Sequence, residues 1–259
     1  MEEQTSSVFF TTFATVIIFN MMGIDKESVG AAVWKELNLW DLFLIFGFIL
    51  TSLAVSLVTG QFSALSFIGG TLSILCVIFG AKGSMINFLF GFLGSLILGF
   101  IMFKSGIYAM AAFYILYNVP MQFIGWRKWT KLRLKPQSGT VRTQWMSWPQ
   151  RLLMTVSTVL LIAGFYFILS RYTDDVQPLS DSAAVSVAIV TQFVLVFAFI
   201  EQWFLWIAMD IVMGIVWIIS WKAGTPHAAI QFVLEMFYLL NALRGVFLWI
   251  RLEKSNGDK

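Results

Sequence analysis

The sequence predicts an all-helical membrane protein that crosses the bilayer several times. Of its 259 residues, 59% are hydrophobic and only 12% are charged, whereas soluble domains carry about 25% charged residues. The mean hydropathy is +0.82. The apolar residues gather into runs of roughly 20, which is the length that a helix needs to cross a bilayer. A soluble fold is therefore excluded.

Taken in order, the apolar runs predict eight spans if the first of them truly crosses. Residues 7–22 are apolar but short, so we expect an interfacial helix there. The spans are expected at 40–60, 62–81, 84–103, 107–126, 150–171, 182–200, 202–221 and 227–250. The organisation that follows is an N-terminal segment with an extra helix (1–61), a three-helix unit (62–129), a basic loop with a linker helix (130–180), a second three-helix unit (181–251) and a tail (252–259).

The loop between Arg127 and Arg151 sets the expected orientation. It carries seven Lys and Arg side chains and no acidic residue. Basic loops are retained in the cytoplasm, so we expect this loop and the C-terminus to be cytoplasmic in a multi-pass protein of the cell membrane. A lipid-binding or nucleic-acid-binding patch is the alternative for this loop. We expect no nucleic-acid partner, because the basic residues lie between apolar spans.

The residue inventory argues against an enzyme. Cys76 is the one cysteine and His227 the one histidine, which excludes disulfides and metal sites built on several such ligands. No Ser/His/Asp set and no pair of catalytic carboxylates is evident. The sequence therefore predicts no catalytic residues, no metal and no cofactor.

Two matched helix ends suggest an internal repeat. The third span ends in Phe103-Lys104-Ser105-Gly106, and the seventh ends 118 residues later in Trp221-Lys222-Ala223-Gly224. The fourth span closes with Gly125 and Trp129, and the eighth closes with the same spacing 120 residues later. Three helices, one linker and three helices form a parallel repeat, whose substrate site lies between the halves. Chance similarity between apolar sequences is the alternative.

The most informative stretch is 201–210, EQWFLWIAMD. Trp203, Trp206 and Asp210 are spaced i, i+3 and i+7, so they share one helix face. A carboxylate at that depth costs about 2.5–3.5 kcal/mol unless it faces a partner, a cavity or a substrate. Two indoles and a carboxylate would hold a polar solute with a flat ring. The alternative is two interfacial tryptophans and a buried structural Asp.

Further polar side chains lie within the spans and are candidates for the same interface. Asn118 and Gln122 are four residues apart on the fourth span, and Pro120 between them is expected to loosen the helix. For each amide, hydrogen bonding between helices is the alternative role. The acid Glu235, like Asp210, is expected to face a cavity. The remaining candidates are Asn87, Gln192, Tyr238 and Asn241.

These residues also carry a resemblance to a known family. The stretch 201–210 resembles the WxxWxxx(N/D) signature of the PnuC family of nicotinamide riboside transporters. Pro120-Met-Gln-Phe-Ile-Gly-Trp126 resembles the end of that family's third core helix, and Leu240-Asn-Ala-Leu-Arg244 resembles a motif near the end of its last helix. The resemblance covers about residues 62–251.

The resemblance implies seven core helices arranged 3+1+3, similar to the SWEET fold, an extra N-terminal helix and a homotrimer. It implies facilitated diffusion of an unphosphorylated vitamin or nucleoside, which a cytosolic kinase then traps by phosphorylation. Trp203, Trp206 and Asp210 would line the site, with Gln122, Asn118 and Asn241 as polar contacts. Relatives that carry thiamine, riboflavin or deoxyribonucleosides leave those substrates open.

The chemistry favours nicotinamide riboside, a cation with a flat pyridinium ring and a ribose diol. Indole faces attract such a ring by cation–π interaction, and an ionised Asp210 would offset its charge. Thiamine, also a cation, would be served as well, whereas a neutral deoxynucleoside would gain less. A proton-coupled carrier using Asp210 and Glu235 stays open, as do a channel and a structural membrane protein.

Overall fold

The computed structural model describes residues 37–60, 63–104, 108–132, 140–173, 178–225 and 228–257. The expected interfacial helix at 7–22 and His227 lie outside these ranges. The chain separates into two compact units, Met1–Leu42 and Phe43–Lys259, and the following description concerns the second.

The described part of the chain is helical, with no strand beyond two isolated bridges. Seven of its helices are long and apolar enough to span a membrane, which confirms an all-helical, multi-pass membrane protein. They are α3 (Leu39–Thr59), α4 (Ala64–Ala81), α5 (Asn87–Lys104), α8 (Trp148–Tyr172), α9 (Pro178–Val196), α10 (Gln202–Lys222) and α11 (Ala228–Gly257).

The fourth expected span, 107–126, is not one regular helix. It consists of α6 (Tyr108–Ala112), the π-helix η1 (Phe113–Asn118) and α7 (Val119–Lys131). The Val119 amide bonds back to the Tyr114 carbonyl, which is the i→i−5 pattern of a π-helix. Pro120 follows directly and has no N–H to donate. The structure thus has a wider helical turn just before Pro120, in the region where we expected the helix to loosen.

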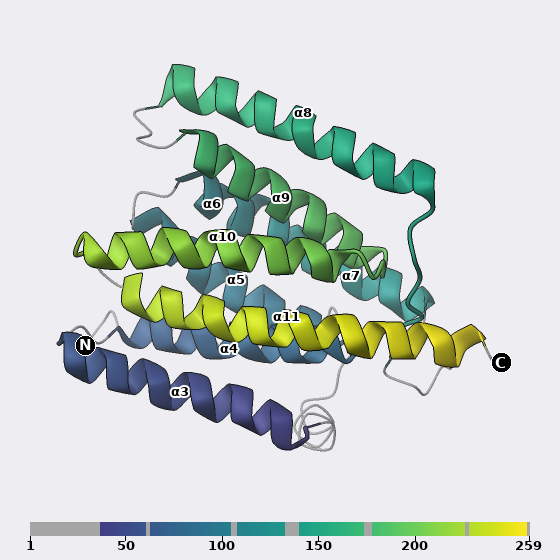
Figure 1. Cartoon of the computed structure of the whole chain (residues 1–259), viewed down its shortest axis with the longest axis horizontal. Helices are drawn as coiled ribbons and strands as arrows, with labels where there is room; N and C mark the ends of the chain where they lie inside the picture. Colours follow the sequence, from purple (N-terminus) through teal and green to yellow (C-terminus); the bar gives the residue numbers. More distant parts are fainter. Residues whose placement is uncertain are drawn as a thin grey trace. The chain divides into compact units, whose positions relative to one another are not determined.

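The contacts between helices arrange six of them in a closed ring, which Figure 1 shows from the side, with the helices seen lengthwise. Helix α4 packs against α5 and α11, helix α7 packs against α5 and α9, and helix α10 packs against α9 and α11. The order around the ring is thus α4, α5, α7, α9, α10, α11. Helix α8 lies outside the ring along α9, and most of its apolar side chains are exposed, as expected for a lipid-facing helix.

Helix α3 packs on the outside of the ring through its part beyond Phe43. The Phe48 ring lies edge-on to Phe237 of α11, with ring centroids 6.0 Å apart. The same ring fills the space in which a Cβ on Gly70 of α4 would sit.

Two tight turns join α4 to α5 and α9 to α10, and they have the same hydrogen bonds. The Gly83 amide donates to the Gly80 carbonyl at 2.9 Å, and the Ala198 amide donates to the Leu195 carbonyl at 2.8 Å. Gly83 has φ +66° and Ala198 has φ +58°, so both turns use the left-handed region. These turns explain why α5 starts later than the expected 84 and why α9 ends before the expected 200.

Candidate functional site

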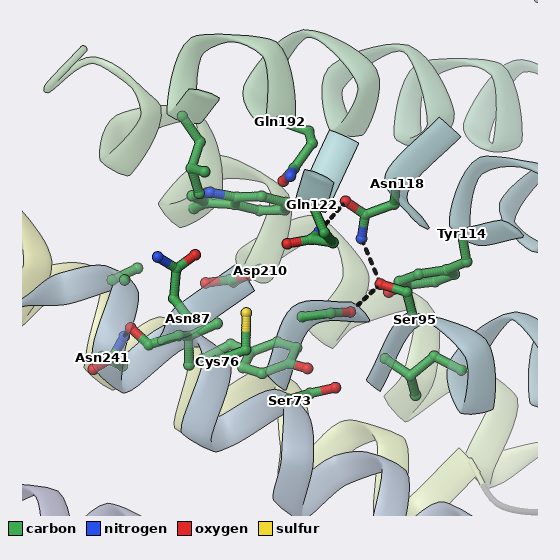
Figure 2. A pocket seen from close by; sticks show the side chains of 18 of the residues that line it. Ser73, Cys76, Asn87, Ser95, Tyr114, Asn118, Gln122, Gln192, Asp210 and Asn241 are labelled. Atoms are coloured by element: carbon green, nitrogen blue, oxygen red, sulfur yellow. Dashed lines mark hydrogen bonds between the residues drawn. The ribbon is translucent and has the colours of Figure 1, made fainter. Parts of the chain in front are cut away.

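The ring encloses a cavity of about 110 Å³, and all six ring helices contribute to its wall. Nine of the ten predicted site residues line it: Asn87, Asn118, Gln122, Gln192, Trp203, Trp206, Asp210, Tyr238 and Asn241. Figure 2 shows Asp210 from α10 and the amides from the neighbouring helices around one space. Glu235 is not among the residues that line this cavity, although it is buried.

The face of α10 that lines the cavity is the one that helical spacing predicts. Trp203 and Asp210 are 3% and 4% exposed, and Trp206 is partly exposed. Among the described residues that line the cavity, Asp210 is the one carboxylate and none is Lys, Arg or His. A ligand in this cavity meets acidic, not basic, side chains.

The two indoles differ in their surroundings. Trp203 belongs to the packed core: its ring lies 5.8 Å from that of Trp249, and it covers Gly245 so closely that a Cβ there would come within 2.6 Å of the ring. Trp206 is only packed against the edge of that core. Trp203 thus lines the cavity and also packs in the core, whereas Trp206 mainly lines the cavity.

A directional chain of hydrogen bonds runs along the wall from α7 through η1 to α5 (Figure 2). The Gln122 amide donates to Asn118 Oδ1 at 2.8 Å, and Asn118 Nδ2 donates to Ser95 Oγ at 2.9 Å. Ser95 in turn donates to the Gly91 carbonyl. The pairing confirms that Asn118 and Gln122 share a face. The chain fixes Asn118 and leaves Gln122 Oε1 as an acceptor beside Gly91.

Two further amides are held by main-chain carbonyls. Asn87 Nδ2 donates to the Ser84 carbonyl at 2.6 Å, and Asn241 Nδ2 donates to the Val77 carbonyl at 2.7 Å. Because a carbonyl oxygen can only accept, the amide nitrogen must face it. The bond from Asn241 joins α11 to α4, as expected for an interhelical amide.

Two buried polar atoms of the wall have no hydrogen-bond partner within the described chain. They are Asn241 Oδ1, an acceptor, and Trp203 Nε1, a donor. An unpaired buried polar group costs roughly 1–3 kcal/mol. A ligand that supplies a donor to the first atom or an acceptor to the second would recover this cost.

Sequence reasoning missed four polar wall residues, Ser73, Cys76, Ser95 and Tyr114. Ser95 had a signal, because it follows Asn87 and Gly91 at intervals of four residues along α5. Tyr114 had the same signal, because it precedes Asn118 and Gln122 at intervals of four residues along the fourth span.

An aromatic cluster that we call the plug packs beside the cavity and contains Phe88, Trp129, Trp203 and Trp249, of which Trp203 also lines the cavity. The Phe88 and Trp129 rings are 4.8 Å apart, edge to face, and the Trp129 and Trp249 rings are 5.8 Å apart. Trp129 is near the last residue of α7, so the plug lies at the end of the ring from which the basic loop starts.

Comparisons with known proteins agree with this architecture. The family model described as "Nicotinamide mononucleotide transporter" matches residues 63–251. A nicotinamide riboside transporter PnuC of Neisseria mucosa is 28% identical over 80% of this chain and 79% of that protein. A protein of the same name from Haemophilus influenzae is 26% identical over 74% of this chain and 81% of that protein.

A solved structure supports the fold. The crystal structure titled "Crystal structure of the Vitamin B3 transporter PnuC" superposes with a TM-score of 0.75 and 24% identity, covering 87% of this chain and 98% of that one. Its family, like the relatives above, consists of transporters and not enzymes. The ring of helices, the cavity and these matches together show that the chain belongs to the PnuC, or nicotinamide mononucleotide transporter, family.

Proposed function

We propose that this protein is a permease for nicotinamide riboside and works by facilitated diffusion. The observation that carries the proposal is the composition of the cavity wall. Helix α10 contributes Asp210, Trp203 and Trp206, and the other helices contribute side-chain amides. The relatives named as nicotinamide riboside transporters support the same substrate.

The charge of the substrate fits this wall. The pyridinium ring of nicotinamide riboside is positive, and an indole face attracts such a ring by about 1–2 kcal/mol when both are desolvated. The carboxylate of Asp210, whose side chain is buried in the cavity wall, would offset this charge. The ribose hydroxyls are donors, which suits the acceptors Asn241 Oδ1 and Gln122 Oε1.

The same wall disfavours the mononucleotide that the family model's description mentions. A phosphate would add a negative charge near Asp210, and no Lys, Arg or His is among the described wall residues to pair with it. Burying an unpaired anion is strongly unfavourable. We therefore infer transport of the riboside in preference to its phosphate ester.

We propose that the ring is a 3+1+3 parallel repeat similar to the SWEET fold, with α8 as linker and α3 as an extra N-terminal helix. The matching turns at Gly83 and Ala198 support the repeat, and α3 lies ahead of the matched residues 63–251. We further propose a homotrimer, which the mass of the detergent-solubilised protein would test.

For orientation, the basic residues between Arg127 and Arg151 favour a cytoplasmic loop and C-terminus in the cell membrane. Net uptake then results when a cytosolic kinase phosphorylates the riboside, because the product carries a charge that the cavity disfavours. Transport of thiamine, riboflavin or a deoxyribonucleoside is the alternative. Transport coupled to protons through Asp210 and Glu235 is a second alternative, with less support.

The test is uptake of labelled nicotinamide riboside into proteoliposomes, with unlabelled thiamine, riboflavin, deoxyuridine and the mononucleotide as competitors. We expect saturable uptake that stops at equal concentrations and that only nicotinamide riboside itself blocks. Uptake blocked by thiamine would move the substrate to that vitamin. Accumulation against the gradient when the outside is acidified would replace facilitated diffusion by proton coupling.

A further inference from the structure

An extended segment, residues 140–147, crosses the end of the ring where the plug lies, and we call it the strap. The Val141 amide donates to the Gly83 carbonyl at 3.0 Å, and the Gln144 amide donates to the Ala198 carbonyl at 3.1 Å. Gly83 belongs to the α4–α5 turn and Ala198 to the α9–α10 turn. The strap therefore bonds the two three-helix units to each other at one end of the ring.

The strap also covers the plug. The Val141 side chain is fully buried in the same cluster as Trp129 and Trp249. The Thr143 hydroxyl donates to the Trp249 carbonyl at 3.2 Å, and its side chain is also buried. Alternate residues of the strap thus point into the plug. A second main-chain hydrogen bond joins the strap to the α9–α10 turn, because the Ile200 amide donates to the Gln144 carbonyl at 3.0 Å.

Glu201 fastens the far end of the strap. Its two carboxylate oxygens each accept from the Met146 amide at 3.1 Å. Its Oε1 also accepts from Arg151 Nε at 2.9 Å, and Arg151 Nη2 lies 2.8 Å from the same oxygen. Glu201 is 8% exposed and directly precedes α10, the helix that carries Trp203, Trp206 and Asp210.

The plug combines Phe88 and Trp129 of the first three-helix unit with Trp203 and Trp249 of the second, so a path through it would form where the two units separate. The strap is bonded to both units, so it must release at least one of the turns before they separate. We propose that the strap is a lock on the basic-loop end of the cavity and that Glu201 is the latch that holds it closed. The proposal rests on the proposed function only in taking the cavity as the transport path.

The chain contains its own reporter for this lock. Cys76 is the one cysteine of the sequence, and it lines the cavity. Its Sγ lies beside Gly91 and the Gln122 side chain in the cavity wall. A thiol reagent that cannot cross the membrane will therefore modify Cys76 only when the cavity opens to the side on which the reagent is applied.

The test measures the rate at which a small, positively charged methanethiosulfonate modifies Cys76 in sealed vesicles. The reagent is applied either to the face that carries the basic loop or to the opposite face. Wild type is compared with Glu201→Gln and Glu201→Ala. Arg142→Ala is the matched control, since it removes a positive charge from the exposed side of the strap while leaving the Glu201 contacts. Cys76→Ser gives the background.

We expect labelling from the basic-loop face to rise several-fold in Glu201→Gln and further in Glu201→Ala, which also removes the acceptor of the Met146 amide. The labelling rate of Arg151→Met from this face should be similar to that of Glu201→Gln. The rate of Arg151→Lys should lie between those of Arg151→Met and wild type. Labelling from the opposite face should stay at or below the wild-type rate, because a cavity that opens more often to one side is less available to the other.

Three results would overturn the lock. One is an unchanged rate from the basic-loop face in both Glu201 variants. Another is an equal rise from both faces, which means general loosening. The third is that Cys76 is labelled in the unfolded protein but in none of the folded variants, from either face. The assay uses no substrate, so its failure leaves the proposed nicotinamide riboside transport intact. Failed riboside uptake, conversely, would leave the labelling result intact.

Discussion

Trp129 and Trp249 each donate their indole N–H to the three-helix unit to which they do not belong. Trp129 Nε1 donates to the Leu195 carbonyl at the end of α9 at 3.2 Å, and Trp249 Nε1 donates to the Gly80 carbonyl at the end of α4 at 3.0 Å. Each of these carbonyls also accepts the amide of its own turn, from Ala198 and Gly83. The two units are thus joined by a pair of reciprocal bonds.

This reciprocity predicts matched losses of stability. Trp129→Phe and Trp249→Phe each remove one indole N–H while keeping an aromatic ring, so each should lower the free energy of unfolding by about 0.5–1.5 kcal/mol. Melting temperatures of the purified protein in detergent measure this. Trp148→Phe is the control, because Trp148 is 75% exposed. A loss in only one of the two variants would show that the bonds are not equivalent.

Asp210 should distinguish substrates by charge. Asp210→Asn keeps the size of the side chain and removes its charge, so affinity for nicotinamide riboside should fall about tenfold or more, which is at least about 1.4 kcal/mol. The reduced dihydro form of the riboside is neutral and similar in shape, so its affinity should change little. Calorimetric titration of both ligands at one pH tests this. Equal losses for the two ligands would refute the charge argument.

The two indoles should give different phenotypes. Trp206→Ala should abolish substrate binding with little effect on melting temperature, because the ring is only partly buried at the edge of the core. Trp203→Ala should reduce both substrate binding and the melting temperature, since replacing a buried Trp by Ala lowers the free energy of unfolding by about 3–5 kcal/mol. Binding and melting curves measured on the same preparations separate the effects. Retained affinity in Trp206→Ala would remove this indole from the site.

Gly91 should be intolerant of a methyl group because of the amide beside it. A Cβ at this position would lie 2.5 Å from Gln122 Oε1 and 3.1 Å from Cys76 Sγ. Gly91→Ala should therefore displace Gln122 and weaken substrate binding at least several-fold.

The matched control for Gly91 is Gly164→Ala on α8, where nothing lies within 4 Å of the added atom. That change should leave binding unaltered and raise stability by about 0.5–1 kcal/mol through helix propensity. Unaltered binding in both variants would mean that the position of Gln122 does not matter for the substrate.

The sequence was most informative where helices are regular. Trp203, Trp206 and Asp210 lie on one face because the 3.6-residue period holds throughout α10. The spacing of four also holds for Tyr114, Asn118 and Gln122, which all line the cavity, but the sequence did not predict that the helix widens into a π-helix between Phe113 and Asn118. Glu235 precedes Tyr238 by three residues on α11, yet only Tyr238 lines the cavity. A shared helix face does not tell how far along the helix the cavity extends.

The turns were invisible for a different reason. Apolar residues continue through Phe197, Ala198 and Phe199, so hydropathy extends the helix past its true end at Val196. A left-handed backbone at Ala198 is imposed by tertiary contacts, since alanine does not favour it. The strap likewise reads as part of a polar, basic loop, although its Val141 and Thr143 side chains are buried.

The position of Trp249 on α11 has a consequence for biogenesis. During synthesis, α4 and α5 are made long before Trp249, so the Gly80 carbonyl lacks its second donor until α11 is inserted. A chain truncated ahead of α11 would lack one helix of the ring and would expose the open side of the ring to lipid. We expect such products to be degraded by membrane proteases, and quality control therefore depends on α11.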